Sequence, residues 1–343
     1  MLLQLGLIGR LGWIYRSVCY MHNLIPWGTA LRDYATENRE YRLALLFIIL
    51  DVLFWGFSFV STKVVLSQIP PISIAFFRQL IAAATLIILV YYTRTPSRIA
   101  LNDIGNIAVA SFFGIVMYFV FENLGLQYTT ASNASMIVAA LPGFTLFGEA
   151  LLFKFKVTWK MIFCLTLSLI GAFLVVTVNG KVDLSSASFF GNLLVLMAIV
   201  CFVIYNILNR NLSDKYGSLD IITNQSIASI FLFIPFIIPE MKKWPAFSEL
   251  SVTVLVNLLF LGVFCSGFAN IFYIYAARRL GATVSSAFLN LVPMVTVVCG
   301  YVILQDRLTW IQVCGMALIM IAIFSLKRLI PRPTLTTKNR SAN

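Results

Sequence analysis

Apolar runs of about 20 residues, each long enough to cross a bilayer as a helix, recur along this chain from residue 43 to residue 326. Hydrophobic residues make up 60% of the sequence and charged residues only 11%, whereas a soluble domain has about 45–50% and about 25%. The pattern predicts an all-α polytopic membrane protein. We expect ten transmembrane helices, at residues 43–66, 72–92, 104–125, 132–152, 158–178, 189–209, 219–238, 252–275, 283–304 and 309–327.

The net charge of +12 comes from basic residues in the short connectors between these runs. If the N-terminus is cytoplasmic, nineteen Lys and Arg residues fall on the cytoplasmic side and four or five on the other, in the sense of the positive-inside rule. We therefore expect a multi-pass protein of a bacterial-type inner membrane with both termini in the cytoplasm. We therefore expect the lipid bilayer, and no nucleic acid, as a partner of the chain.

Two terminal segments lie outside the apolar runs. Residues 1–41 form a basic, amphipathic segment in which Arg10 and Arg16 interrupt the apolar residues, which favours an interfacial helix. Initiation at Met21 is an equally good interpretation of the first 20 residues. Residues 329–343 form a basic tail that we expect to be disordered.

The chain also matches itself, without a gap, at an offset of 151 residues. We therefore predict two repeats, at residues 42–180 and 188–328. Because each repeat has five helices, an odd number, the second copy is inverted in the membrane. Inverted repeats are common in secondary transporters. The identical pairs include Ala131/Ala282, Ser135/Ser286, Pro142/Pro293, Thr145/Thr296, Thr158/Thr309 and Trp159/Trp310, and the apolar pattern continues to Phe173/Phe324.

Several stretches resemble the EamA-type proteins of the drug/metabolite transporter superfamily: "LFWGFSFVSTKVVLSQIPPISIAFFRQLIAA", "LQYTTASNASMIVAALPGFT" and "LGATVSSAFLNLVPMVTVVCGYVILQDRLTW". The resemblance covers about residues 43–327. It implies ten helices in two inverted repeats and the export of small metabolites or amphipathic compounds. It also implies that the fifth and tenth helices lie at the periphery while the others surround a central cavity. The chain departs from the common pattern at Glu149 and in its long N-terminal segment.

Arg78 is the one full positive charge within the apolar run of residues 72–89. An arginine near the bilayer centre costs about 2.5–3.5 kcal/mol on insertion scales. We therefore expect it to face a wet cavity, where its planar guanidinium suits a carboxylate or a phosphate. Two alternatives remain open, namely snorkelling to the headgroups and a structural counter-ion. The repeat places the polar residue Gln225 near the matching position.

Three acids lie within the predicted helices, namely Asp51, Glu149 and Glu122, in our order of preference for a proton-coupling role. Burial disfavours the charged form of a carboxylic acid, as a proton carrier requires. Asp51 shares a helical stripe with Trp55 and Ser58. The alternatives are that Asp51 or Glu149 pairs with Arg78 or lies near the headgroups, and that Glu122 lies close to the surface.

Other polar residues within the apolar runs are candidate substrate contacts, although amides and hydroxyls also bond one membrane helix to another. Pro142 and Pro293 are candidate kinks where two helices bend to gate opposite sides, or static kinks, because proline removes a backbone donor. Besides Arg78, the candidate substrate-binding residues are Trp55, Ser58, Asn133, Tyr205, Asn206, Asn270, Tyr273 and Asn290.

The sequence has no GxxxxGK[ST], HExxH or GxSxG motif, so ATP-driven transport and membrane hydrolysis lack support. His22 is the single histidine and the six cysteines form no CxxC pair, so we expect neither a cofactor nor a metal. We predict a secondary transporter, not an enzyme, that exports amino acids or amphipathic compounds by alternating access, with or without coupling to protons. The alternatives are an exchanger of phosphorylated sugars or nucleotide sugars and a scaffold or sensor that transports nothing. Nothing in the sequence fixes the oligomeric state.

Overall fold

The computed structural model of the chain describes residues 26–93, 99–129, 131–153, 156–176, 186–296, 298 and 310–329. The predicted interfacial helix in the first 20 residues, and the predicted tail from residue 330 onward, lie outside these ranges. The chain divides into two compact units, Met1–Leu45 and Leu46–Asn343. The described part of the first unit, residues 26–45, is helical. All residues of the site discussed below belong to the second unit.

Six helical segments are long and apolar enough, among the described residues, to cross a membrane. They are Arg39–Val65, Pro71–Thr93, Leu101–Tyr128, Phe189–Ser213, Ser218–Ile237 and Val252–Leu280. Four shorter apolar helices are Leu141–Leu152, Trp159–Gly171, Ala282–Thr296 and Val313–Leu326. Each lies within or across one of the ten predicted ranges, which makes the protein a multi-pass membrane protein.

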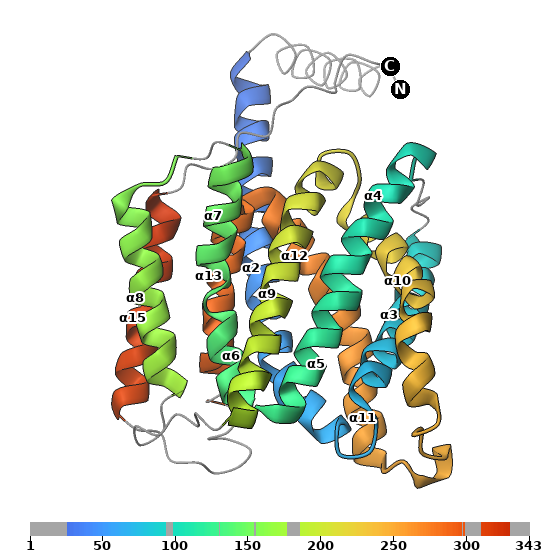
Figure 1. Cartoon of the computed structure of the whole chain (residues 1–343). Helices are drawn as coiled ribbons and strands as arrows, with labels where there is room; N and C mark the ends of the chain where they lie inside the picture. Colours follow the sequence, from blue (N-terminus) through green and yellow to red (C-terminus); the bar gives the residue numbers. More distant parts are fainter. Residues whose placement is uncertain are drawn as a thin grey trace, which may run out of the picture. The chain divides into compact units, whose positions relative to one another are not determined.

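Individual helices appear in Figure 1 with the following bounds. The first half contains α2 (Pro26–Val65), α3 (Pro71–Thr93), α4 (Leu101–Ser111), α5 (Tyr118–Tyr128), α6 (Ala131–Val138), α7 (Leu141–Phe153) and α8 (Trp159–Val176). The second half contains α9 (Ser186–Ser213), α10 (Ser218–Met241), α11 (Val252–Phe260), α12 (Ala269–Leu280), α13 (Ala282–Phe288) and α15 (Trp310–Leu329). Helices α8 and α15 pack against each other at one edge of the bundle (Figure 1).

Two helices that we expected to be continuous are broken just before their prolines. The predicted helix 132–152 is split into α6 and α7 by a turn at Ala139–Ala140, and Pro142 is the second residue of α7. The predicted helix 283–304 consists of α13, a 3₁₀ turn at Leu289–Leu291 (η4), and a further helical stretch at 292–296 that contains Pro293. A proline lacks the backbone N–H that would bond the preceding turn, so each helix breaks there and restarts one residue before its proline.

A π-helical segment interrupts the same helix of each half. It lies at Phe112–Met117 (η1), between α4 and α5, and at Leu261–Phe268 (η3), between α11 and α12. The offset of 151 residues carries 112–117 onto 263–268, inside η3. Such π-bulges are frequent at functional sites, and both segments contribute to the site described next.

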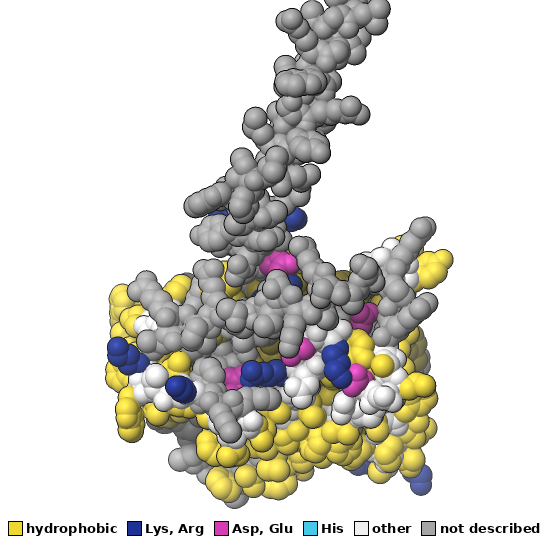
Figure 2. Space-filling model, turned by 90° about the horizontal axis from the view of Figure 1, so that it is seen from above, with side chains coloured by type: hydrophobic (Ala, Val, Ile, Leu, Met, Phe, Trp, Pro, Cys, Tyr) yellow, Lys and Arg dark blue, Asp and Glu magenta, His cyan; other side chains and the backbone are white. Residues whose placement is uncertain are grey.

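The bundle has two chemically different ends. The basic end, as we call it, carries Lys156, Lys160, Arg210, Lys215, Arg278 and Arg279, where α8 begins and where α9 and α12 finish. Figure 2, seen from above, shows charged side chains gathered on this face, with hydrophobic side chains around them. The opposite end carries Lys63, Lys242 and Lys243 among the described residues.

Candidate functional site

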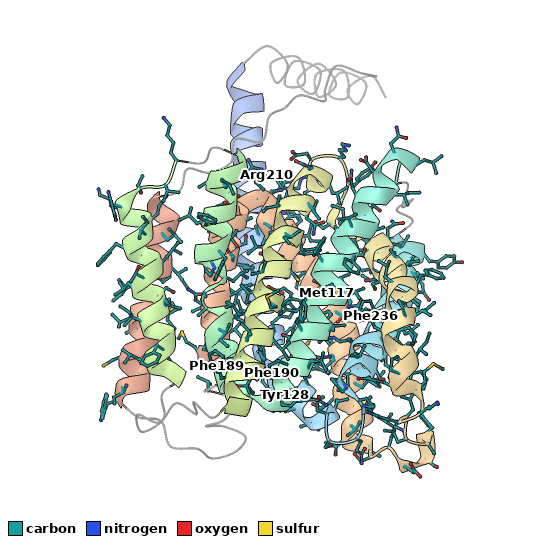
Figure 3. The ribbon with its side chains drawn as sticks, in the orientation of Figure 1. Met117, Tyr128, Phe189, Phe190, Arg210 and Phe236 are labelled. Carbon is teal, nitrogen blue, oxygen red and sulfur yellow. The ribbon has the colours of Figure 1, made fainter. Side chains whose placement is uncertain are left out.

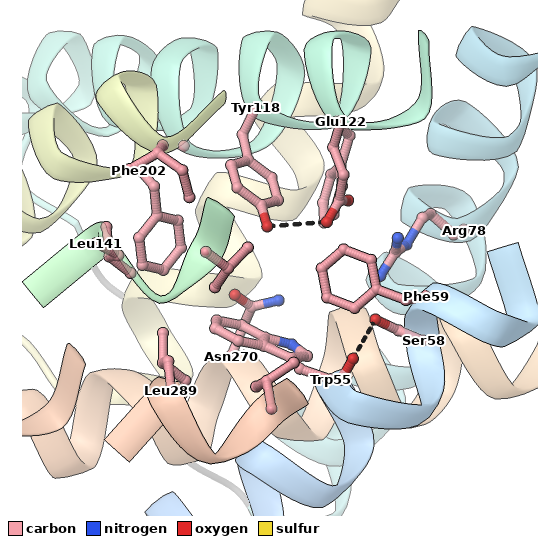
Figure 4. Close-up of a pocket in the computed structure, with 15 residues that line it drawn as sticks. Trp55, Ser58, Phe59, Arg78, Tyr118, Glu122, Leu141, Phe202, Asn270 and Leu289 are labelled. Atoms are coloured by element: carbon pink, nitrogen blue, oxygen red, sulfur yellow. Dashed lines mark hydrogen bonds between the residues drawn. The ribbon is translucent and has the colours of Figure 1, made fainter. Parts of the chain in front are cut away.

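A small polar cavity lies in the middle of the bundle, between α2, α3, η1, α5, α9 and α12 (Figure 4). We call it the central cavity. Its volume is about 20 Å³, which is close to the minimum that one water molecule needs. Aromatic and aliphatic side chains complete its walls. Its polar lining residues are Trp55, Ser58, Arg78, Tyr118, Glu122 and Asn270.

Arg78 reaches the central cavity from α3 and is 2% exposed. Its Nε donates a hydrogen bond of 2.8 Å to the Ser266 hydroxyl on η3, and its guanidinium carbon lies 4.0 Å from the centroid of the Phe119 ring. Close packing of α3 on η3 makes this possible, because a Cβ added to Gly262 would lie 3.1 Å from the Arg78 carbonyl oxygen. Arg78 is therefore buried at the cavity and does not snorkel. Neither of the two ion pairs found among the described residues includes it.

Glu122 faces the same cavity and is 6% exposed. The Tyr118 hydroxyl, one helical turn earlier, donates to its carboxylate at 3.0 Å (Figure 4). Glu122 also lies within electrostatic reach of Arg78. A carboxylate and a guanidinium thus face one cavity without a direct ion pair, so each retains capacity for a ligand.

Asp51 lies on α2, one turn before Trp55, and is fully buried. Neither of its carboxylate oxygens has a hydrogen-bond partner among the described residues. It lines neither of the two polar cavities, but it is within electrostatic reach of the Tyr205 and Tyr273 hydroxyls. A buried, unpartnered carboxyl group is stable in its neutral form, which suits a group that binds and releases a proton.

A second, larger cavity, which we call the vestibule, lies between α7, α9, α12 and α13 at the basic end. Its volume is about 370 Å³, within the range of about 300–1,000 Å³ typical of small-molecule sites. Arg210, on its rim, has a side chain that is 48% exposed, and Figure 3 places this residue at the upper end of α9. The polar lining residues are Glu149, Tyr205, Asn206, Asn209, Arg210, Ser213, Asp214, Tyr273, Arg278 and Thr283.

An aromatic layer separates the two cavities. Phe202 lines the central cavity, and its ring centroid lies 5.4 Å from that of Tyr205 and 5.3 Å from that of Tyr273, which both line the vestibule. Phe202 also contacts Trp55 and Tyr118, at centroid separations of 5.7 and 5.4 Å. A solute that moves from one cavity to the other must displace these rings.

Hydrogen bonds between α3 and its neighbours close the bundle at the opposite end. The Glu240 carboxylate at the end of α10 accepts bonds of 2.7 Å from both the backbone N–H and the hydroxyl of Ser73. The Trp244 indole N–H donates to the same hydroxyl at 2.7 Å. The Asn123 amide on α5 donates to the Pro71 carbonyl oxygen at 2.9 Å. The central cavity is therefore separated from this end by a bonded layer.

The repeated architecture also has counterparts among known proteins. The profile of the EamA-like transporter family matches residues 42–177 and again residues 189–327. The chain belongs to the EamA-like transporter family. The family match covers both halves of the chain and includes both the central cavity and the vestibule.

Relatives of this EamA-like protein align with it along most of their length. An uncharacterized transporter of Archaeoglobus fulgidus is 25% identical over 279 residues, which cover 81% of this chain and 96% of the relative. The uncharacterized transporter YcxC of Bacillus subtilis is 27% identical, over 82% of this chain and 93% of its own. A probable terminal-alkyne amino-acid exporter of Streptantibioticus cattleyicolor is 24% identical, over 82% and 92%.

The fold also matches a solved crystal structure. It superposes with a TM-score of 0.67 at 15% sequence identity and covers 84% of this chain and 99% of the other. At this level of identity the likeness concerns the fold alone.

The predicted site residues fall into four groups. Trp55, Ser58, Arg78, Glu122 and Asn270 line the central cavity, and Tyr205, Asn206, Tyr273 and Glu149 line the vestibule. Asp51 is buried close to both tyrosines. Asn290 lines neither cavity, because its amide donates to the Ser168 hydroxyl on α8 at 2.5 Å, the helix-to-helix use that we kept open. The Asn133 side chain lies outside the described part of the structure.

Sequence reasoning missed part of both cavities. Phe119 and Phe202 gave no signal, because an aromatic residue in an apolar helix is equally typical of a lipid-facing position. Asn209 and Arg210 occur in the stretch "NRN" at the end of α9. Arg210 was predicted to be a cytoplasmic basic residue and not a site residue. Its place four residues after Asn206, one helical turn along the same face, is the signal that was available.

Proposed function

We propose that this protein is a secondary transporter that exports small metabolites, amino acids or amphipathic organic compounds, by alternating access. In this proposal the ten apolar segments form two inverted five-helix repeats, residues 42–180 and 188–328. Both termini lie in the cytoplasm and the chain lies in the inner membrane. The basic end is then cytoplasmic, in agreement with the positive-inside rule.

One observation carries the proposal. A small polar cavity in the centre of an apolar bundle is separated by a bonded layer from the opposite end, and only by an aromatic layer from the much larger vestibule. This arrangement suits alternating access, because a binding site near the middle of the membrane lies between two passages that can open in turn.

Three residues have distinct roles in the proposed cycle. Arg78 binds an anionic group of the substrate, because its guanidinium is buried at the cavity and its hydrogen-bond partner among the described residues is the neutral Ser266. Glu122, on α5, attracts a cationic group. Asp51 takes up and releases the coupling proton, a role supported by its complete burial and its lack of a bonded partner among the described residues.

Two further findings bear on the substrate. The relative from Streptantibioticus cattleyicolor is a probable exporter of an amino acid, which favours solutes of that class here. An exchanger of phosphorylated sugars would need several cations at its centre, whereas Arg78 is the one cationic side chain among the described residues that line the central cavity.

The proposal is tested by counterflow in proteoliposomes, with amino acids and amphipathic compounds, in the presence and absence of a pH gradient. We expect accumulation of at least one compound, a response to the gradient, and loss of counterflow in Arg78→Ala. Accumulation that is indifferent to pH would make the protein a facilitator and remove the role of Asp51. An Arg78→Ala variant that is expressed and transports normally would refute the central site.

A further inference from the structure

We propose that the vestibule is a binding site of its own for a zwitterion whose ammonium and carboxylate groups are attached to one carbon, as in a free α-amino acid. This inference rests on the proposed function, because it assigns the first binding step of export to a site at the cytoplasmic end. The vestibule differs from the central cavity in its position, its volume and its lining residues.

The negative pole of the vestibule is Glu149, on α7. Glu149 is 8% exposed, and its carboxylate accepts a hydrogen bond from the Thr283 hydroxyl on α13. This bond fixes one carboxylate oxygen, Oε2, against the wall. The other oxygen, Oε1, faces Arg210 and is the acceptor for a ligand ammonium group.

The positive pole is Arg210, on α9. Its Nη1 lies 3.6 Å from Glu149 Oε1, longer than the roughly 2.7–2.9 Å of a tight charge-assisted hydrogen bond. With 48% of its side chain exposed, against 10% for Glu149, the Arg210 guanidinium can turn toward a ligand carboxylate while the Glu149 carboxylate stays in the wall. The pair is therefore loose enough for a ligand to enter.

Two buried amides add hydrogen-bond donors beside Arg210. Asn206 and Asn209, one turn and one residue before it on α9, are each 6% exposed. The Gln225 amide donates to the Asn209 side-chain oxygen at 2.8 Å. The amide nitrogen of Asn209 therefore points away from Gln225. Neither amide nitrogen makes a well-formed hydrogen bond with the described residues, although each lies beside a tyrosine hydroxyl. Buried donors of this kind suit a carboxylate.

The spacing and the walls define the ligand class. Poles that are 3.6 Å apart match charges on one carbon, whereas an ω-amino acid holds its charges farther apart. A purely anionic compound draws Arg210 away and leaves the buried Glu149 carboxylate without a cationic partner, which is costly. A purely cationic compound makes no use of Arg210. Four further lining residues are apolar, namely Ile274, Ala277, Leu280 and Val284, and we expect an apolar side chain of the ligand to lie against them. Ser213, Asp214 and Arg278 also belong to the lining.

The test measures equilibrium binding to the purified full-length protein with three probes: L-leucine, L-leucinamide, which lacks the negative charge, and N-acetyl-L-leucine, which lacks the positive charge. We expect L-leucine to bind at least about tenfold more tightly than either blocked analogue. In Glu149→Gln the preference for L-leucine over N-acetyl-L-leucine should fall to about threefold or less, and in Arg210→Gln the preference over L-leucinamide should fall likewise.

Controls separate this result from misfolding and from the central site. Lys160→Gln and Glu249→Gln change exposed charges outside the vestibule and should keep the wild-type ratios. Repeating the comparison in an Arg78→Gln background, which removes the guanidinium of the central cavity, isolates the vestibule, because Arg78 does not line it. The crossed pattern of lost preferences is specific to the two poles, since a misfolded variant loses affinity for all three probes.

Equal binding of the three probes by the wild type, no binding of L-leucine, or unchanged ratios in Glu149→Gln would overturn the vestibule site. The proposed function fails in a different way. If the binding ratios appear but no counterflow of any compound is seen, the vestibule site stands and the transport proposal does not.

Discussion

Gly114, in the π-helical segment η1, offers a sharp test of the packing between the two cavities. A Cβ added at this position would lie 2.7 Å from the Cβ of Tyr205 and closer still to its ring carbons. The Cβ of Tyr205 is fixed by the α9 backbone, so no change of side-chain rotamer relieves this contact. Gly114→Ala therefore forces η1 and α9 apart, and we expect it to cost about 1–3 kcal/mol, as for other overpacked cores.

The same helical run contains a matched control. Gly105, on α4, has nothing within 4 Å of an added Cβ, so Gly105→Ala should gain about 0.5–1 kcal/mol from the better helix propensity of alanine. Thermal unfolding of the purified protein should place Gly114→Ala below the wild type and Gly105→Ala at or above it. Because Tyr205 belongs to the aromatic layer, counterflow should fall in Gly114→Ala alone. Equal unfolding temperatures for the two variants would refute the close approach of η1 to α9.

Substitutions at three other residues test the central cavity, the proton carrier and the opposite end. Arg78→Gln should abolish counterflow, and Arg78→Lys should restore little of it, because a lysine lacks the planar group that both stacks on Phe119 and bonds Ser266; recovery to more than half of the wild-type rate would contradict this. Asp51→Asn should transport at the same rate with and without a pH gradient in proteoliposomes, whereas a gradient response like that of the wild type would exclude Asp51 as the proton carrier. Glu240→Gln keeps the shape of the side chain but weakens two bonds to Ser73 by about 1 kcal/mol each. It should therefore increase labelling of a cysteine placed at Ser58 by an impermeant thiol reagent added from the opposite end, and unchanged labelling would mean that Glu240 does not hold that end closed.

The positions of the membrane helices could be predicted closely from hydropathy. The predicted range 72–92 corresponds to α3, Pro71–Thr93, and 309–327 corresponds to α15, Trp310–Leu329. Helix ends that extend beyond the apolar run were missed. The predicted range 252–275 stops short of Leu280, because Arg278 and Arg279 continue the helix until Gly281, whose φ of 87° suits glycine and ends it.

The direction in which a polar side chain points could not be predicted in the same way. Lipid and protein interior are equally apolar, so the composition of a membrane helix carries little information about which face is inside. Asn290, three residues before Pro293, was the stronger candidate and Asn270 the weaker, yet Asn290 bonds Ser168 and Asn270 lines the central cavity. The π-helical segments had no composition signal either, although both place glycines, Gly114 and Gly262, against a neighbouring helix.

Helix α3 links the proposed substrate site in the central cavity to the bonded layer at the opposite end. Ser73 and Arg78 lie five residues apart on this helix, about 7.5 Å along its axis, and α3 carries no proline between them. Glu240 holds Ser73, and Asn123 holds the Pro71 carbonyl oxygen, while the residue next to Asn123 is Glu122 in the central cavity. A ligand that draws Arg78 and Glu122 together therefore shifts α3 against α5 and strains the bonds that close the opposite end. Such coupling is reciprocal. We therefore expect that weakening the Glu240–Ser73 bonds changes the affinity of the central cavity for its ligand. In this proposal, movement of the single helix α3 is sufficient for binding at the central cavity to open the opposite end.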